Sequence, residues 1–395
     1  MSRFNRNSAV ITSVIVLMLI LITCLCGCTG SPDTASTTDF LTEGESQSPQ
    51  TITITDSYGR EVTVPVNPER VVCSGAGCLR LLTYLEGSDL VVGVDNIDKD
   101  NNSFSEKDYN ARAYYLAHPE YPSLPLIGNH HSADNPESII LCNPDVIFRT
   151  NGPTAAISDE ELQEKTGIPV VGLNYGDPGE NRDVMYDSLR LMGKVIGKEE
   201  RVEEVINFFD AQIADLADRV DGVEPSNPLT TYIAGISSHG PQGFQSTSPT
   251  YIPFEYINAN KFNVANDPEN PSSHADVAKE QILDWDPDVI FVELGTVQLN
   301  PDAIDTLKTD ESLQLMKAVK NDNVYGLVPY NWYSYNYGTA IISGYYAGMI
   351  LYPEQFEDVD LEEKADEIYS FLVGEPVYGD IKERFEGLAY SKIPL

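Results

Sequence analysis

Positive charge is scarce in this chain. Only 25 lysine and arginine residues stand against 61 aspartate and glutamate residues, which gives a formal net charge of −36. A surface of this sign repels nucleic acids and anionic lipid headgroups, so the composition excludes a nucleic-acid-binding protein. The acidic residues form no long runs, which excludes an acidic cation store and favours a soluble acidic exterior.

The sequence also lacks the motifs of common enzyme classes. No nucleophile stands in a recognisable pattern with a base, and no glycine-rich phosphate loop with its lysine is present. The nearest match is to a dinucleotide-binding fingerprint, in which Gly75 and Gly77 follow a strand and Asp95 ends the next one. Arg80 stands where that fingerprint needs a third glycine for close helix–strand packing, so a dinucleotide enzyme is disfavoured.

Cysteine is too rare beyond the N-terminus for a disulfide framework. Cys73, Cys78 and Cys142 are an odd number, and Cys73 and Cys142 are predicted to be core residues.

Residues 1–28 have the layout of an export signal. The apolar run over residues 9–22 follows two arginines and is short for a membrane-spanning helix. The sequence Leu-Cys-Gly-Cys that follows looks like the lipobox of exported lipoproteins, with Cys28 as the lipid-bearing residue. Cys24 is a poorer alternative, and a plain signal anchor is the other interpretation. We therefore expect an extracytoplasmic protein, lipid-anchored to the outer face of the cell membrane.

A repeated stretch organises the rest of the chain. Residues 137–148 read ESIILCNPDVIF, and residues 280–291 read EQILDWDPDVIF. The shared proline ends a short helix, and the apolar, β-branched run after it predicts a parallel strand buried on both faces. Each copy thus predicts a helix, a tight turn and a buried strand, and the pair predicts two α/β lobes of similar plan.

Hydrophobic periodicity and turn residues supply the other elements. A hairpin is predicted over residues 51–66, and one long helix or two joined helices over residues 183–220. Further strands are predicted at 70–73, 91–94, 124–127, 170–173, 230–234 and 324–328. Further helices are predicted at 78–85, 159–166, 251–258, 302–319, 339–351 and 361–372.

These elements predict an α/β fold of two Rossmann-like lobes with mainly parallel sheets, joined by a long rigid connecting helix, with a ligand cleft between the lobes. The expected segments are an export signal (1–28), a disordered tether (29–50), an N-terminal lobe (51–182), the connecting helix (183–222) and a C-terminal lobe (223–395).

Ligands of open α/β sheets bind beyond the carboxyl ends of the strands, so the residues that follow the predicted strands are the candidate contacts. Residues 330–337 hold five aromatic side chains in one loop, which suits a ligand with flat faces or packing between the lobes. Arg80 could face an anionic ligand or form a surface ion pair. His130 and His131 are interpreted as solvent-exposed imidazoles rather than metal ligands. The predicted ligand-binding residues are Arg80, Asn96, Asn129, Tyr175, His239, Phe244, Trp332, Tyr333, Tyr335 and Asn336. No catalytic residue, cofactor or protein-bound metal is predicted.

The chain resembles the class III substrate-binding proteins of ABC importers, which bind iron–siderophore complexes, haem and cobalamin. The resemblance covers about residues 51–381 and rests on the opening segment TITITDSYGREVTVPVNPERVV, both Pro-Asp-Val-Ile-Phe units, the long helix and the lipoprotein-like start. It implies a monomeric, non-catalytic receptor that delivers a metal chelate to a permease and its ATPase. A ferric siderophore-type complex is the favoured cargo, with cobalamin, haem or an oxyanion as alternatives. An exported enzyme or redox protein on a similar fold is the alternative from another class.

The resemblance also bears on permease docking. Many members carry a glutamate in the first helix of the first lobe that docks to arginines of the permease, and Arg80 stands at that position here. Arg80 is therefore expected to contact the ligand or a different surface of the permease. Glu255 in the second lobe is the predicted docking residue.

Overall fold

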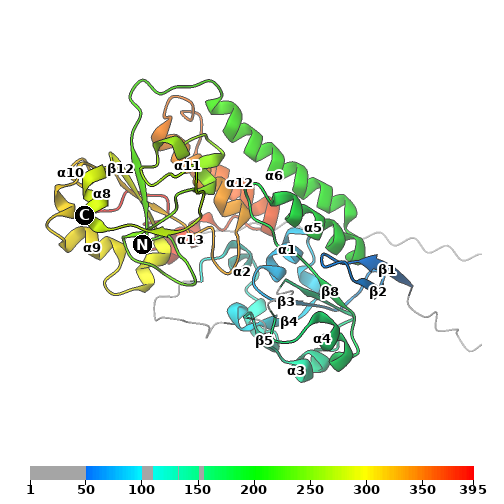
Figure 1. Ribbon diagram of the computed structural model, residues 1–395. Coiled ribbons are helices and arrows are strands. Elements are labelled where there is room, and N and C mark those ends of the chain that lie inside the picture. Colours follow the sequence, from blue (N-terminus) through cyan, green and yellow to red (C-terminus); the bar gives the residue numbers. More distant parts are fainter. Residues whose placement is uncertain (1–49, 100–109, 132, 151–154) are drawn as a thin grey trace, which may run out of the picture. The chain divides into compact units, whose positions relative to one another are not determined.

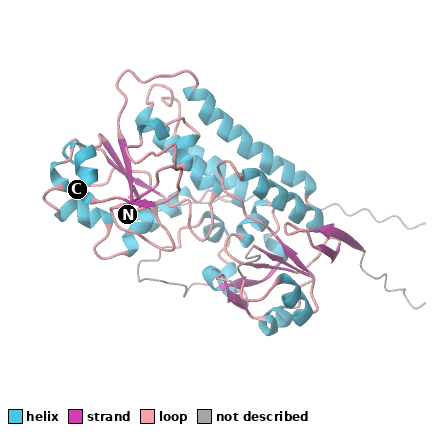
Figure 2. Cartoon of the chain, in the orientation of Figure 1, coloured by secondary structure: helices cyan, strands magenta, loops and turns pink. Residues whose placement is uncertain are grey.

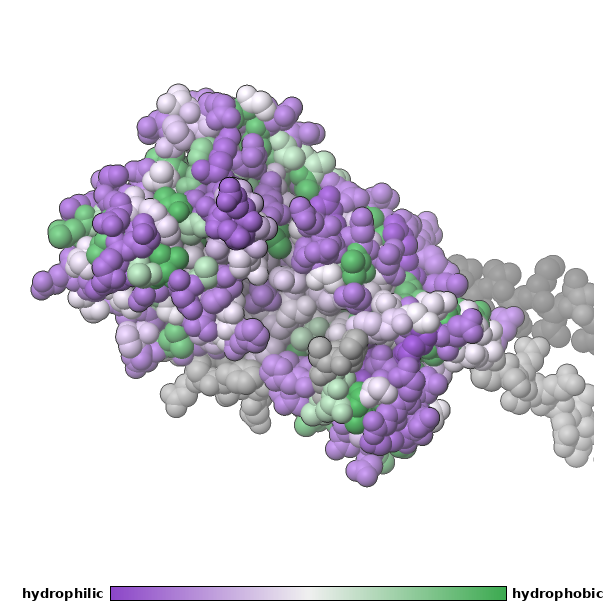
Figure 3. Space-filling view, in the orientation of Figure 1, coloured by the Kyte–Doolittle hydropathy of each residue, from purple (hydrophilic) through white to green (hydrophobic). Residues whose placement is uncertain are grey.

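The computed structural model describes residues 50–99, 110–131, 133–150 and 155–395. The predicted export signal with Cys28 and nearly all of the tether lie outside these residues. Within the described part, no helix is both long and apolar enough to cross a membrane. The fold is mixed α/β with mostly parallel sheets, as predicted, and its strands gather in separate groups among the helices (Figure 2). Hydrophilic residues cover most of the face shown in Figure 3, as the charge composition leads one to expect.

Six strands form the first sheet (Figure 1). They are β3 (Val71–Ser74), β4 (Val91–Asp95), β5 (Leu126–Asn129), β6 (Ala133–Asp134), β7 (Val146–Arg149) and β8 (Val170–Gly172), in the order β6-β5-β4-β3-β7-β8. Only β6 is antiparallel to its neighbour. Val71 and Cys73 belong to one buried cluster and Val72 to another. The central strand is therefore covered on both faces, which explains its lack of polar alternation.

Helices cover both faces of this sheet, together with a hairpin on one of them. One cover includes α3 (Pro136–Cys142) and α4 (Asp159–Thr166), whose Ile139 and Leu162 join the smaller buried cluster. The other includes α1 (Cys78–Tyr84) and the predicted hairpin of β1 (Thr51–Thr55) and β2 (Glu61–Pro65). Because α1 follows β3 directly, its first turn lies at the carboxyl end of that strand.

Three parallel strands form the second sheet: β9 (Thr231–Ala234), β12 (Val289–Glu293) and β13 (Val324–Leu327), in the order β13-β12-β9. Residues 390–393 run along the outer edge of β13, where the Ile393 N–H donates to the Val324 carbonyl. That segment satisfies backbone groups that an edge strand would otherwise expose. The helices of this half include α8 (Lys279–Trp285), α11 (Tyr337–Leu351), α12 (Leu361–Val373) and α13 (Tyr378–Arg384).

The repeated stretch forms the same unit twice, as predicted. Helices α3 and α8 each end in a left-handed residue, Asn143 with φ 48° and Asp286 with φ 42°. The aspartate after each proline then binds the start of the neighbouring strand. Asp145 accepts the Arg70 N–H at 2.9 Å, and Asp288 accepts the Thr230 N–H at 3.0 Å. The aspartate of the motif thus sets the register in which the buried strand enters its sheet.

The long helical segment consists of two helices, α5 (Arg182–Ile196) and α6 (Glu199–Val220). They are separated at Gly197, whose φ of 70° is a left-handed conformation that glycine adopts without strain. Helix α6 contacts both halves of the described chain. The Arg201 Nε donates to the Tyr84 carbonyl of α1 at 3.1 Å, and its guanidinium lies 4.2 Å from the Phe371 ring centroid in α12.

Two helix predictions are wrong in extent. The helix expected over 302–319 is broken into α9 (Ala303–Thr309), a 3-10 turn and α10 (Lys317–Lys320). Asp310 accounts for the break, because its carboxylate accepts the Ser312 N–H at 2.9 Å and so competes with the helical backbone. The helix expected over 251–258 shrinks to α7 (Ile252–Glu255). The short elements α2 (Ala113–Ala117), β6, β10 (Ser246–Thr247), β11 (Ala275–Asp276) and α13 were not predicted.

Candidate functional site

The loop of residues 330–336, here called the aromatic loop, lies against α1 of the first half. Arg80 Nη1 donates to the Tyr335 carbonyl at 2.9 Å. Arg80 Nη2 donates to the carbonyls of Trp332 at 3.1 Å and Tyr333 at 3.3 Å. The structure therefore brings together two predicted parts of the site that are far apart in the sequence.

Three arginines are among the largest fully buried side chains, namely Arg80, Arg112 and Arg149. Arg149 pairs with Asp134 and with Asp159, and Arg112 pairs with Asp98 at 3.3 Å. For Arg80, the described residues provide no carboxylate within 4.0 Å. Its acceptors are the loop carbonyls and the Tyr175 hydroxyl, at 2.8 Å from Nη1. A buried cation is thus held by neutral groups alone, which are weaker partners than a carboxylate.

The aromatic loop has an unusual backbone. Tyr333 and Ser334 both adopt positive φ, 48° and 70°, although neither is glycine. Such residues cost on the order of 1–3 kcal/mol each when they are held in sparsely populated regions. Asn336 holds this shape from within the loop, since its Nδ2 donates to the carbonyls of Tyr330 at 3.1 Å and Trp332 at 3.3 Å. The loop is therefore a preformed unit rather than a loose connection.

The ring of Tyr333 reaches into the first half. Its centroid lies 4.8 Å from the Arg112 guanidinium carbon and 5.0 Å from the His130 ring centroid, with the two rings nearly perpendicular. Arg112 and Arg80 both lie against Tyr114, at 5.2 and 5.1 Å from its ring. The two guanidinium groups therefore border one surface, on which the aromatic loop rests.

His130 is buried, with 4% of its surface exposed, so its interpretation as a solvent-exposed imidazole is wrong. Its Nδ1 lies 2.9 Å from Asn96 Oδ1, and its backbone N–H donates to the same oxygen at 3.0 Å. Burial first, and then the charges of His131 and Arg112, lower the pKa of His130 to about 4. The imidazole is therefore neutral at physiological pH. His131 is exposed, as predicted.

The space beside Arg80 is nearly filled. A cavity of about 10 Å³ lies between Arg80, Tyr84, Tyr114 and Asn336, enough for about one water molecule. A ligand larger than this needs the aromatic loop or its neighbours to move.

The remaining predicted residues lie elsewhere. Asn129 is exposed, and its Oδ1 accepts the His131 N–H at 2.9 Å. His239 is exposed at a left-handed φ of 52°. Phe244 is buried beside Tyr232, with ring centroids 5.6 Å apart, and lines a separate cavity of about 390 Å³ with residues that include Asp276 and Lys279.

Sequence reasoning missed Arg112, Asp98 and Tyr114. The Tyr114 hydroxyl donates to Asp98 Oδ1 at 2.6 Å, and Arg112 binds the same oxygen at 3.3 Å. The tyrosine-rich insertion after β4 could have pointed to these residues, because Arg112 within it had no evident partner in the sequence.

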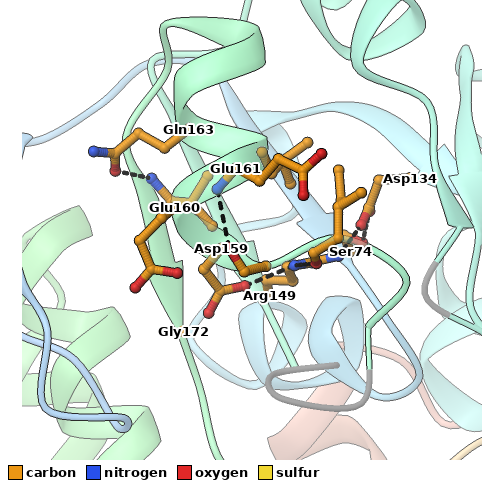
Figure 4. A network of polar contacts seen from close by, with 12 residues as sticks. Ser74, Asp134, Arg149, Asp159, Glu160, Glu161, Gln163 and Gly172 are labelled. Carbon is orange, nitrogen blue, oxygen red and sulfur yellow. Dashed lines mark hydrogen bonds and ion pairs between the residues drawn. The ribbon is translucent and has the colours of Figure 1, made fainter.

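A polar network lies along the carboxyl edge of the first sheet (Figure 4). Arg149, at the end of β7, stands between Asp134 of β6 and Asp159 at the start of α4, and Ser74 at the end of β3 binds Asp134. Both Nη atoms of Arg149 are bound within this edge, while its buried Nε has no hydrogen-bond partner in the described part of the chain, so the network is mainly a structural support of the sheet edge. Among the described residues, no group of three or more His, Cys, Asp or Glu side chains is arranged to hold a metal ion.

Two carboxyl groups are buried at strand ends without an ion pair in the described part of the chain. Asp95 Oδ2 accepts the Gly75 N–H at 2.6 Å, while its Oδ1 has no hydrogen-bond partner there. Glu293 accepts the Ser237 N–H at 2.8 Å. Burial raises the pKa of Asp95 to about 8 and that of Glu293 to about 7. Both groups are therefore largely protonated at mildly acidic pH.

A family of periplasmic binding proteins matches residues 71–330. The chain belongs to this family. The α/β architecture and mostly parallel sheets of this chain are those of TroA-like binding proteins. Members of the family are binding proteins of ABC importers rather than enzymes. The resemblance to class III substrate-binding proteins is thereby confirmed, and the exported-enzyme alternative is set aside.

Individual relatives share the fold over most of the chain. The molybdate-binding protein MolA of Haemophilus influenzae is 24% identical over 334 residues, which are 80% of this chain and 89% of that protein. Its molybdate-bound structure matches with a TM-score of 0.60 over 82% of this chain and 98% of that one. The TroA-like periplasmic binding protein FepB of Veillonella parvula is 22% identical, with a TM-score of 0.56 over 82% of this chain and 97% of that one. An ABC transporter substrate-binding lipoprotein of Bacillus subtilis, YvrC, is 21% identical over 70% of this chain and 78% of that protein.

The buried carboxyl of Asp95 gives a prediction for stability. Its pKa rises on folding from 3.8 to about 8, so the folded protein holds a proton that the unfolded chain releases. This contribution to stability is complete below about pH 4 and is lost as the pH rises through about 8. We expect Asp95→Asn to gain stability relative to the wild type as the pH rises. Thermal unfolding at pH 5 and pH 8 measures the difference, and the exposed Asp89→Asn serves as the control. The same difference at both pH values would contradict the assignment.

Proposed function

We propose that this substrate-binding protein of an ABC importer captures a small oxyanion of the molybdate type. The observation that carries the proposal is Arg80, a buried cation for which the described residues provide no carboxylate within 4.0 Å. Removing one partner of a buried charge pair is costly, so a cation without such a partner is a suitable place for an anionic ligand. The relative MolA is named as molybdate-binding, which supports the same chemistry.

The net charge of the chain makes this local positive charge more important. A surface with a formal charge of −36 repels an approaching anion at long range. Arg80 and Arg112 lie 5.1 and 5.2 Å from the Tyr114 ring centroid, so two guanidinium groups are close to each other in the first half. Charge-assisted hydrogen bonds from guanidinium to an oxyanion are about twice as strong as those between neutral groups.

A ferric siderophore-type chelate is the second candidate. The aromatic loop favours it, because Trp332, Tyr333 and Tyr335 are only partly buried and offer ring faces to a bulky ligand. Each such side chain contributes roughly 1.5–3 kcal/mol when a ligand buries it fully. The space beside Arg80 would then have to open much further than an oxyanion requires.

We assign one role to each of the predicted segments. Residues 51–182 and 223–395 act as the two lobes, residues 183–222 act as the connector, and residues 29–50 tether the receptor to the membrane. The permease and its ATPase are the proposed partners, and the receptor acts as a monomer. The comparisons support an extracytoplasmic location.

The cargo is tested by titrating the purified protein with molybdate, a ferric siderophore, haem and cobalamin. We expect molybdate to bind with a stoichiometry of one and to quench or enhance the fluorescence of Trp332, one of two tryptophans in the chain. Arg112→Gln should weaken molybdate binding by about tenfold or more, since about 1.4 kcal/mol is a factor of ten. Binding of the ferric siderophore alone would favour the second candidate. Binding of none of the four would overturn both.

Glu255 is the proposed permease-docking residue. Its surface on α7 is largely exposed, and partial desolvation of the carboxyl group, followed by the negative charges of Glu180 and Asp177, raises the pKa of Glu255. We expect Glu255→Gln to leave ligand binding unchanged and to lower transport in reconstituted vesicles by about tenfold, which corresponds to about 1.4 kcal/mol of docking energy. The exposed Glu357→Gln is the matched control and should transport normally. Equal transport by both variants would remove Glu255 from the docking surface.

Cys28 is the proposed lipid attachment site. Export and lipidation would leave it as the first residue of the mature protein, as expected for a lipoprotein, and the relative YvrC is named as one. We expect Cys28→Ala to accumulate as precursor or to be released in soluble form, whereas Cys24→Ala should be processed normally. Membrane fractionation and N-terminal mass spectrometry measure both. Normal processing of Cys28→Ala would point to Cys24 or to an uncleaved helix.

A further inference from the structure

The aromatic loop uses the donors that an anionic ligand would need. Both Nη atoms of Arg80 donate to loop carbonyls, those of Trp332, Tyr333 and Tyr335, at distances of 2.9 to 3.3 Å. Tyr175 reinforces the contact, because its hydroxyl donates to the Tyr335 carbonyl at 2.9 Å. In this arrangement, the guanidinium that could bind an anion is already occupied.

The tip of the loop also fills the adjoining surface. The ring of Tyr333 covers Arg112 at 4.8 Å and meets His130 at 5.0 Å. Asn336 binds loop carbonyls from its own half, so the contacts to the first half are the ones that an anion has to replace, and the positive-φ turn at Tyr333 and Ser334 relaxes once they break. The contacts that would have to break include those of Arg80, Tyr175 and the Tyr333 ring.

The partners of Arg80 make this contact replaceable. They are three carbonyls and one phenol, all without formal charge. An oxyanion offers the same number of acceptors with a negative charge, and charge-assisted hydrogen bonds are about twice as strong as neutral ones. A neutral ligand has no such advantage over the loop. The exchange of partners therefore favours negatively charged ligands.

We propose that the aromatic loop is a plug that occupies the surface of Arg80, Arg112 and His130 in the ligand-free protein, and that an anionic ligand displaces it by competing for Arg80. This inference rests on the proposed function, because it assumes an anionic cargo. Arg80 then acts as a specificity-determining residue: it holds the site closed and releases it to a ligand of the right charge.

Hydrogen exchange of the loop amides tests the plug. The Trp332 and Asn336 amides are hydrogen-bonded within the loop, to the carbonyls of Ser334 and Tyr330, and report its opening. We expect Arg80→Gln to speed their exchange by at least about tenfold, the equivalent of about 1.4 kcal/mol. Tyr175→Phe should produce a smaller increase, because it removes one neutral partner and retains the guanidinium.

Arg201→Gln is the matched control. Arg201 also joins α1 to α12, through Tyr84 and Phe371, and its hydrogen bonds and ion pairs among the described residues do not involve the aromatic loop. Its replacement should lower the melting temperature and leave the exchange of the loop amides at the wild-type rate. This control separates release of the loop from a general loss of stability.

Molybdate is the probe for displacement. At a concentration that titration shows to be saturating, it should raise loop exchange in the wild type towards the rate of Arg80→Gln and change that variant little. Slower exchange in the wild type would overturn the plug, because the loop would then close over the ligand. Wild-type exchange rates in Arg80→Gln would overturn the role of Arg80. If molybdate does not bind at all, the proposed oxyanion function and displacement both fail, while the Arg80→Gln result still decides whether Arg80 holds the loop.

Discussion

A guanidinium group keeps its proton inside a protein, so every buried arginine must be surrounded by acceptors. Three arginines are among the largest fully buried side chains of this structure, and their acceptors arrange the carboxyl edge of the first sheet. Arg149 joins β6 to the start of α4 through Asp134 and Asp159. Arg112 fixes the segment after β4 through Asp98. Arg80 reaches across to the aromatic loop and so connects the two halves of the described chain.

The sign of these charges matters because the rest of the chain is acidic. The exterior carries most of the net charge of −36, whereas three buried cations gather near one edge of one sheet. Arg112 and Arg149 are paired with Asp98, Asp134 and Asp159, so the attraction that an anion meets close to the site comes mainly from Arg80. Salt screens the long-range repulsion strongly, with a Debye length of about 8 Å at physiological ionic strength, and the buried charge much less. A saline environment would thus favour capture.

The fold was predictable where local sequence and tertiary structure agree. The repeated Pro-Asp-Val-Ile-Phe units predicted one interior strand of each sheet, β7 and β12, because proline, aspartate and an unbroken apolar run each have a local consequence. The helix over 302–319 was wrong because Asp310 binds the Ser312 amide, a local contact that helical periodicity does not reveal.

The candidate site was predictable only in part. The rule that ligands bind beyond the carboxyl ends of strands selected both Arg80 and the aromatic loop. The two are hydrogen-bonded to each other in the structure. The same rule selected His239, which is exposed, and missed Arg112, whose partner Asp98 and neighbour Tyr333 come from separate segments. The burial of His130 had no signal in the sequence, since it depends on Asn96 and on the Tyr333 ring. Pairings of this kind are set by tertiary packing.

The contact between Arg80 and the aromatic loop also constrains the order of folding. Its partners lie 252, 253 and 255 residues further along the chain. Contacts between such distant residues form late, because the entropy of closing the intervening chain must be offset first. The first sheet can assemble from neighbouring segments while the Arg80 guanidinium still faces water. A chain that emerges from its N-terminus would therefore form the strands of both sheets before it forms the contact of Arg80 with the aromatic loop, and the candidate site would be the last part of the molecule to take shape.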